Sequence, residues 1–138
     1  MSMFVTSRDV REDEFDWGVI GWRCGPGNTG SKRFIVLDAT IHPGERHDFH
    51  KHPDQDEMIV VRSGRLLQYI ELQSEILGPG DSAYIDADVV HASICDGEEP
   101  AAIQIVMAPA MGTDTGYELV DMTGVEPYAA LRAVRSTP

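Results

Sequence analysis

Short apolar segments separated by glycine and proline are the feature that most limits how this chain can fold. The sequence contains 13 Gly and 8 Pro, and the runs between these breaks are rich in β-branched and apolar residues. Helical periodicity is almost absent from them. Short strands at this spacing, with turn residues between them, predict an all-β sandwich or barrel. The runs lie at residues 33–41, 57–62, 65–72, 82–85, 89–94 and 101–107.

The length of the chain predicts one domain over residues 1–138, with a core at about 33–109 between an N-terminal and a C-terminal arm. Residues 73–77 follow the run at 65–72 closely, which predicts a hairpin. Pro127 stands before Tyr-Ala-Ala-Leu-Arg-Ala-Val and predicts one short C-terminal helix, because proline suits the first helical turn.

The charge balance excludes several classes of partner. The chain has 11 Lys and Arg against 23 Asp and Glu, a formal net charge of −12. Nucleic acid is a poor partner for such a surface, because phosphate binding depends on clustered basic residues. No apolar run approaches the ~20 residues of a membrane helix. Cys24 and Cys95 form no disulfide framework, and free thiols fit a reducing compartment. We therefore expect a cytoplasmic protein with neither nucleic acid nor membrane as a partner.

Histidines are concentrated in one short segment that contains four of the five in the chain. His50 and His52 lie two residues apart, so on a strand both side chains point to one face. Glu57 opens the next apolar run and can return beside them with its carboxylate aimed at the same point. His91 lies in a separate apolar run, either as a hydrogen-bonded core residue or as a further ligand. Imidazole and carboxylate groups converging in this way are ligands for first-row transition metals.

The same strand parity makes predictions for the neighbouring residues. Asp48 should share the face of His50, and His47 and Phe49 should lie on the opposite face. His42 and His47 do not fit the spacing of the ligand set, and we expect both at the surface or in loops.

Two segments carry a family resemblance. Residues 44–64 read G-x5-H-x-H-x4-E-x6-G with every fixed position filled, and this segment resembles the first cupin motif. The second cupin motif is G-x5-P-x-G-x2-H-x3-N, and residues 80–95 match its first glycine and its histidine. Asp86, Asp88 and Cys95 replace its proline, second glycine and asparagine.

The resemblance implies a double-stranded β-helix, which is a jelly-roll barrel of two facing sheets. It implies one divalent metal, from among Fe, Mn, Ni, Co, Cu and Zn, held by His50, His52, Glu57 and His91. A cupin with this ligand set favours a small-molecule enzyme, either a dioxygenase or a metal-assisted isomerase, lyase or decarboxylase. The alternative is a non-catalytic module that binds or senses a small ligand. Cupins that resemble this chain are often homodimers, so we also expect a homodimer.

Further residues are candidates for lining the pocket. Ile59 and Val61 share the strand face of Glu57 and predict an apolar wall. Ile59 also stands where some cupin lyases have a tyrosine, which disfavours a lyase of that kind. Cys95 lies four residues after His91 on the same face, as a small buried residue, a fifth ligand or a redox-sensitive thiol. Trp17 and Trp22 are expected to pack against the barrel or across a dimer. The remaining pocket candidates are Arg46, Gln68, Tyr84 and Gln104.

Overall fold

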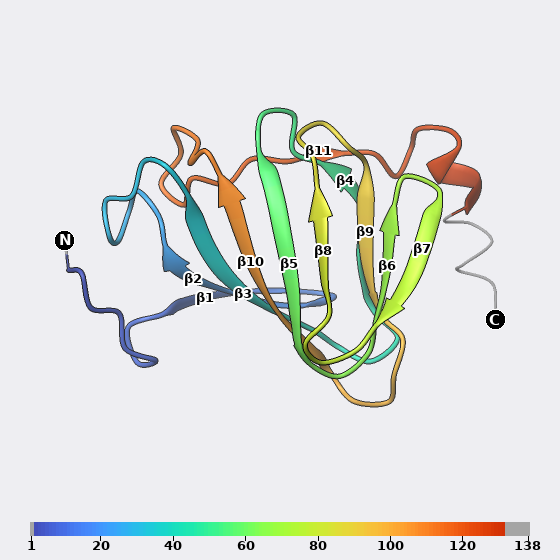
Figure 1. The fold of residues 1–138 in the computed structure, drawn as a ribbon, viewed down its shortest axis with the longest axis horizontal. Helices are drawn as coiled ribbons and strands as arrows, with labels where there is room; N and C mark the ends of the chain where they lie inside the picture. Colours follow the sequence, from blue (N-terminus) through green and yellow to red (C-terminus); the bar gives the residue numbers. More distant parts are fainter. Residues whose placement is uncertain (1, 132–138) are drawn as a thin grey trace.

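Eleven short strands make up the fold in the computed structural model, which describes residues 2–131 (Figure 1). Their β-branched and apolar residues suit a pleated, half-buried surface, and glycine and proline end most of them. The strands are β1 (Arg11–Phe15), β2 (Gly18–Cys24), β3 (Ile35–Ile41), β4 (Arg46–Lys51), β5 (Asp56–Ser63), β6 (Leu66–Ile70), β7 (Gln73–Leu77), β8 (Ser82–Ile85), β9 (His91–Cys95), β10 (Ala101–Ala108) and β11 (Val120–Asp121).

The strands form two antiparallel sheets that face each other. One sheet has the order β1-β2-β3-β10-β5-β8, and the other has the order β11-β4-β9-β6-β7. From β3 onward the chain changes sheet at every connection except the β6–β7 hairpin, as in a jelly roll. The predicted double-stranded β-helix is thereby confirmed.

The main core fills the space between the two sheets. Strand β3 alternates buried and half-buried residues, and its buried members Ile35, Leu37, Ala39 and Ile41 face inward. They pack with the inward residues of β5 and β10, such as Ile59 and Ile105. A second cluster around Phe49 and Tyr69 covers the outer face of the five-stranded sheet, where Tyr128 closes over it. Both faces of that sheet are therefore buried, at least in part.

Some boundaries differ from the predicted ones. The N-terminal arm contributes β1, and β2 extends the six-stranded sheet well before residue 33. The predicted hairpin is present as β6 and β7, paired from Leu66 with Leu77 to Ile70 with Gln73. Residues 128–131 are helical after Pro127, and the remainder of the predicted helix lies outside the described residues.

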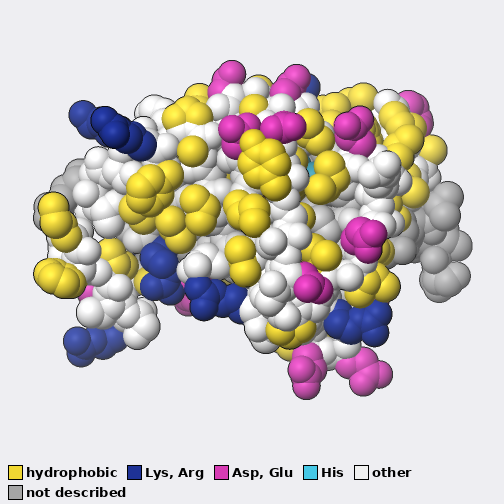
Figure 2. Space-filling model, viewed as in Figure 1, with side chains coloured by type: hydrophobic (Ala, Val, Ile, Leu, Met, Phe, Trp, Pro, Cys, Tyr) yellow, Lys and Arg dark blue, Asp and Glu magenta, His cyan; other side chains and the backbone are white. Residues whose placement is uncertain are grey.

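The outer face of the six-stranded sheet carries exposed apolar side chains. Met58 pairs with both Val106 and Tyr84, so these three lie in one row across β10, β5 and β8. Figure 2 shows apolar side chains over the middle of the face in view and acidic side chains along its upper edge, with hardly any histidine visible. Across residues 2–131, no helix is both long and apolar enough to span a bilayer.

Candidate metal centre

A β-bulge in β4 decides which of its side chains point into the barrel. His47 pairs with Ser93 and His50 pairs with His91, and the register shifts between these two pairs. The shift places Phe49 on the outer face, in the second core cluster, while His47 and His50 both point inward. The predicted position of His47 on the face opposite His50 was therefore wrong. Strict alternation fails here because a bulge sets two residues against one.

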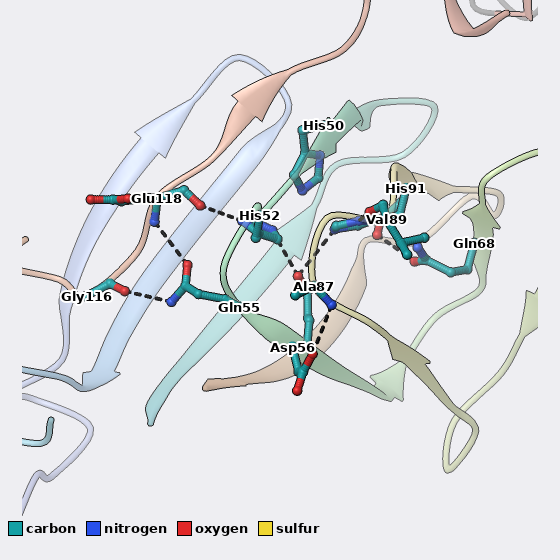
Figure 3. Close-up of polar contacts among 12 residues, drawn as sticks. His50, His52, Gln55, Asp56, Gln68, Ala87, Val89, His91, Gly116 and Glu118 are labelled. Carbon is teal, nitrogen blue, oxygen red and sulfur yellow. Dashed lines mark hydrogen bonds and ion pairs between the residues drawn. The ribbon is translucent and has the colours of Figure 1, made fainter. Parts of the chain in front are cut away.

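Three histidines converge inside the barrel (Figure 3). One ring nitrogen from each of His50, His52 and His91 lies within 4.8 Å of the others, and all three side chains are buried. Glu57 projects from β5 in the facing sheet. Its Oε1 lies 3.0 Å from His52 Nε2 and 3.3 Å from His91 Nε2. The structure thus brings together the four residues that the cupin resemblance implied as ligands.

Backbone carbonyls orient the three imidazoles. The Nδ1 atoms of His50, His52 and His91 lie 2.6, 2.6 and 2.9 Å from the carbonyl oxygens of Asp48, Glu118 and Val89. Because a carbonyl oxygen only accepts hydrogen bonds, each Nδ1 carries the proton and donates it. Each Nε2 is then the atom available to a metal, and this arrangement is typical of histidine ligands.

The centre of the cluster contains acceptors without partners. His52 Nε2, His91 Nε2 and Glu57 Oε1 are buried and have no hydrogen bond among the described residues. Burial alone raises the pKa of Glu57, but the imidazoles of His91 and His52 outweigh it and hold this pKa well below its ordinary value. Burial lowers the pKa of His91, but the Glu57 carboxylate has the larger effect, so this pKa lies above its ordinary value. These groups therefore favour positive charge at the point where they meet, and they fit a bound cation.

The loop before His91 departs from the second cupin motif without losing its shape. Asp88 stands where the motif has its second glycine, and it adopts the left-handed conformation with φ of 69°. Aspartate tolerates that conformation better than most residues. Asp88 also donates its backbone N–H to the carbonyl of His52 at 2.9 Å and pairs with Lys51. Asp56 Oδ1 accepts the N–H of Ala87 at 2.9 Å (Figure 3), so both ends of this loop are held.

Gln55 is a supporting residue that the sequence interpretation missed. It is buried, and its Nε2 donates to the carbonyls of Pro109 and Gly116 at 2.9 and 2.8 Å. Its Oε1 accepts the backbone N–H of Glu118 at 3.3 Å. The carbonyl of Glu118 holds His52, so Gln55 positions a ligand through the 109–118 segment (Figure 3). A lone glutamine in a turn carries no sequence signal for such a role.

A stack of aromatic rings leads from the surface to His50. The ring centroids are 5.2 Å apart for Phe15 and Trp17, 4.6 Å for Trp17 and His47, and 3.9 Å for His47 and His50. Interplanar angles of 6°, 10° and 19° show that all three pairs are stacked. Burial lowers the pKa of His47 to about 4, with Glu57 opposing and His91 adding to the shift. Trp17 packs against the barrel as expected, but His47 is neither a surface nor a loop residue.

Two adjoining hollows lie between the cluster and solvent. The inner one is a narrow space between the sheets, reaching His50, Glu57 and Ser93 and walled by aliphatic residues such as Leu37 and Ile105. The outer one is an open groove of about 450 Å³. Both hollows are bordered by Trp17, Ile20, His47 and Tyr117, which therefore form the boundary between them.

Four of the residues predicted to line the pocket face the barrel interior, although none of them borders the inner hollow. Ile59 and Val61 are buried members of the main core. Gln68 accepts a 2.6 Å hydrogen bond from Ser93, which does border the hollow, and so acts behind it. Cys95 is buried, and its thiol lies 3.1 Å from the carbonyl oxygen of Glu99. It is about 13 Å along the strand from His91 and outside the ligand cluster.

Three predicted pocket residues lie outside the barrel. Arg46 pairs with Ile94 on the outer face of the five-stranded sheet, because the bulge reverses its parity relative to His50. Tyr84 is exposed on the outer face of the six-stranded sheet. Gln104 lies on the same outer face, where it donates to Asp38 and accepts from Arg62. The prediction that these three line the pocket was wrong.

Comparison with solved structures finds the same fold at low sequence identity. An RmlC-like cupin from Shewanella frigidimarina aligns with a TM-score of 0.70 and 14% identity, covering 81% of this chain and 95% of its own. A protein described as a predicted oxalate decarboxylase from Thermotoga maritima aligns with a TM-score of 0.67 and 16% identity, covering 78% and 99%. A sugar phosphate isomerase of the cupin superfamily from Silicibacter pomeroyi aligns with a TM-score of 0.61 and 20% identity, covering 76% of this chain and 74% of its own. No curated protein matches this chain significantly.

The family assignment comes from the sequence match together with this geometry. The Cupin domain family matches residues 27–107, which is more than half of the chain and includes both motifs and all four clustered residues. The surrounding barrel has the two antiparallel sheets of its double-stranded β-helix relatives. The chain is therefore a member of the cupin family, with a buried histidine triad that could hold a metal ion.

Proposed function

We propose that this protein is a metal-dependent cupin enzyme that holds one divalent transition metal with His50, His52, His91 and Glu57. The unpartnered acceptors at the centre of the cluster carry this proposal. His52 Nε2 and His91 Nε2 lie 3.0 and 3.3 Å from Glu57 Oε1, and all three atoms are buried without a hydrogen bond. Buried polar groups without partners are costly, so a cation is the natural occupant of this point. Nitrogen and carboxylate ligands fit Fe, Mn, Ni, Co, Cu and Zn alike.

When bound, the metal would supply Lewis acidity or activation of dioxygen. The residues around it would then bind and orient a small molecule that enters through the outer groove. Among the described residues that border the inner hollow, Glu57 is the one carboxylate, and there is no lysine. A proton-transferring isomerase or lyase needs a positioned general base, and Glu57 and His50 are already assigned to the metal. His47 also borders the hollow, but burial lowers its pKa to about 4, which makes it a weak base. This lining favours a dioxygenase over the isomerase and lyase classes.

Metal content is the first test. Protein purified without chelator should contain about one transition metal per chain, because the cluster supplies one site. His52→Ala should lose that metal, whereas His42→Ala should retain it, since His42 is exposed and lies outside the cluster. Metal-free protein that takes up none of Fe, Mn, Ni or Zn would contradict the proposal.

Catalysis is the second test. Fe(II)-loaded protein should consume dioxygen when a catechol or thiol substrate is added, and His52→Ala should abolish this uptake. Thermal stabilisation by ligands without turnover, across a broad panel, would instead identify a non-catalytic binding module. The homodimer, the cytoplasmic location and the absence of a nucleic-acid partner stay predictions.

A further inference from the structure

We propose that the outer groove selects an aromatic small molecule that carries no negative charge. This inference rests on the proposed function, because the groove is the entrance to the proposed metal site. It names the class of ligand that this entrance accepts. Neither the cupin fold nor the ligand set determines that class.

The groove adjoins the inner hollow that reaches His50 and Glu57 of the cluster. It shares Trp17 and Tyr117 with the narrow inner hollow, and Tyr117 lies against the ring of His52 with centroids 5.1 Å apart. A ligand that reaches the cluster from solvent therefore passes between these two side chains. Because the inner hollow is narrow, the body of the ligand must rest in the groove outside it.

Aromatic side chains dominate the wall of this groove. Phe15, Trp17, Trp22 and Tyr117 all border it, and the exposed fraction of Phe15 is 44%. Trp22 and Tyr117 already form an edge-to-face pair at 5.6 Å and 71°. Aromatic rings prefer offset-stacked or edge-to-face partners, so an aromatic ligand gains more here than an aliphatic one of equal area.

The charges along the path are of one sign. Glu118 borders the groove and Glu57 borders the inner hollow, and neither lining contains lysine or arginine. The chain as a whole has a net charge of −12. Within the groove, an anionic ligand would lose its hydration beside Glu118 with no lysine or arginine to replace it, and this disfavours carboxylates and phosphates.

Four small probes separate charge from aromaticity. Benzyl alcohol, benzylammonium and benzoate share one ring and differ in charge, and cyclohexylmethanol matches benzyl alcohol without the aromatic ring. Trp17 and Trp22, the two tryptophans of the chain, both border the groove, so indole fluorescence and indole N–H signals in NMR spectra report on it directly. Titrations use the full chain after metal removal, so that benzoate cannot bind through a metal.

Benzyl alcohol and benzylammonium should bind and shift both indole signals. Benzoate should bind at least about tenfold more weakly, and cyclohexylmethanol about threefold to tenfold more weakly than benzyl alcohol. Glu118→Gln should weaken the binding of benzylammonium and leave the binding of benzyl alcohol unchanged. The matched control Glu75→Gln, at an exposed position on β7, should change neither. Trp17→Leu should weaken the binding of every probe, and circular dichroism checks that this variant is folded.

Equal binding of benzoate and benzyl alcohol would overturn the charge selection, and equal binding of cyclohexylmethanol would overturn the aromatic selection. If no probe binds and Trp17→Leu changes the oligomeric state, the groove is an interface between copies and the inference fails. Metal uptake without probe binding refutes this inference alone. Probe binding without metal uptake refutes the proposed function and leaves the selectivity of the groove standing.

Discussion

Replacing Gln55 with methionine tests whether one buried amide supports both the fold and the metal site. The substitution keeps a side chain of similar length and removes all three hydrogen bonds of Gln55. The Pro109 carbonyl and the Glu118 N–H lose the bonds that Gln55 gave them. The Gly116 carbonyl is affected less, because it also accepts from the N–H of Met111 at 2.8 Å. The hydrogen bonds to Pro109 and Glu118 are part-buried, so at ~1 kcal/mol for each group left unpaired, the free energy of unfolding should fall by about 2 kcal/mol.

For a chain of this length, that loss corresponds to a decrease in Tm of about 8 °C. Metal affinity should fall by ~10–100-fold, because the Glu118 carbonyl that orients His52 is no longer held. Thermal unfolding and chelator competition measure the two effects, and Gln73→Met, at an exposed position, serves as the control. A Tm within 2–3 °C of the parent, at about 1 kcal/mol per 4 °C, would show that the 109–118 segment holds itself and would refute the reasoning.

Three further predictions concern the ligand set and the motif glycines. His91→Ala should weaken metal binding by more than ~100-fold in a chelator titration. Cys95→Ser should leave metal binding nearly unchanged, since that thiol lies outside the cluster. A larger loss of metal affinity in Cys95→Ser than in His91→Ala would make the site a nitrogen–sulfur centre. Metal affinity should be full at high pH and fall by up to about tenfold per pH unit on acidification. The fall should begin above pH 6.5, because protons compete for His91 and its pKa lies above the ordinary value. A metal affinity that does not change between pH 8 and pH 5 would exclude His91 as a ligand. Gly64→Ala should destabilise the protein by ~2–4 kcal/mol in denaturant unfolding, because a Cβ there meets a backbone oxygen at 2.5 Å. Gly44→Ala has open space around the Cβ and should cost only the ~1–2 kcal/mol of its positive φ. Equal losses for the two variants would contradict this steric explanation.

The local sequence was sufficient to predict the fold class and the convergence of His50, His52 and Glu57. Apolar runs with a period of two and glycine or proline between them leave few alternatives to a β-sandwich or barrel, because each run must bury one face. The spacing of His50, His52 and Glu57 favours side chains that meet at one point, although β4 and β5 lie in facing sheets and not side by side. The cupin resemblance then added His91, which spacing alone could not distinguish from a core histidine.

The tertiary structure decided what lies around that cluster. A bulge in β4 turned His47 inward and Arg46 outward, and strict alternation cannot foresee a bulge. The strands that carry Tyr84 and Gln104 expose those side chains on the outer face, because parity relative to the core depends on long-range pairing. The support of His52 by Gln55 through the 109–118 segment joins residues more than 50 positions apart. Contacts of that separation are set by how the sheets close on each other, and no local pattern in the sequence encodes them.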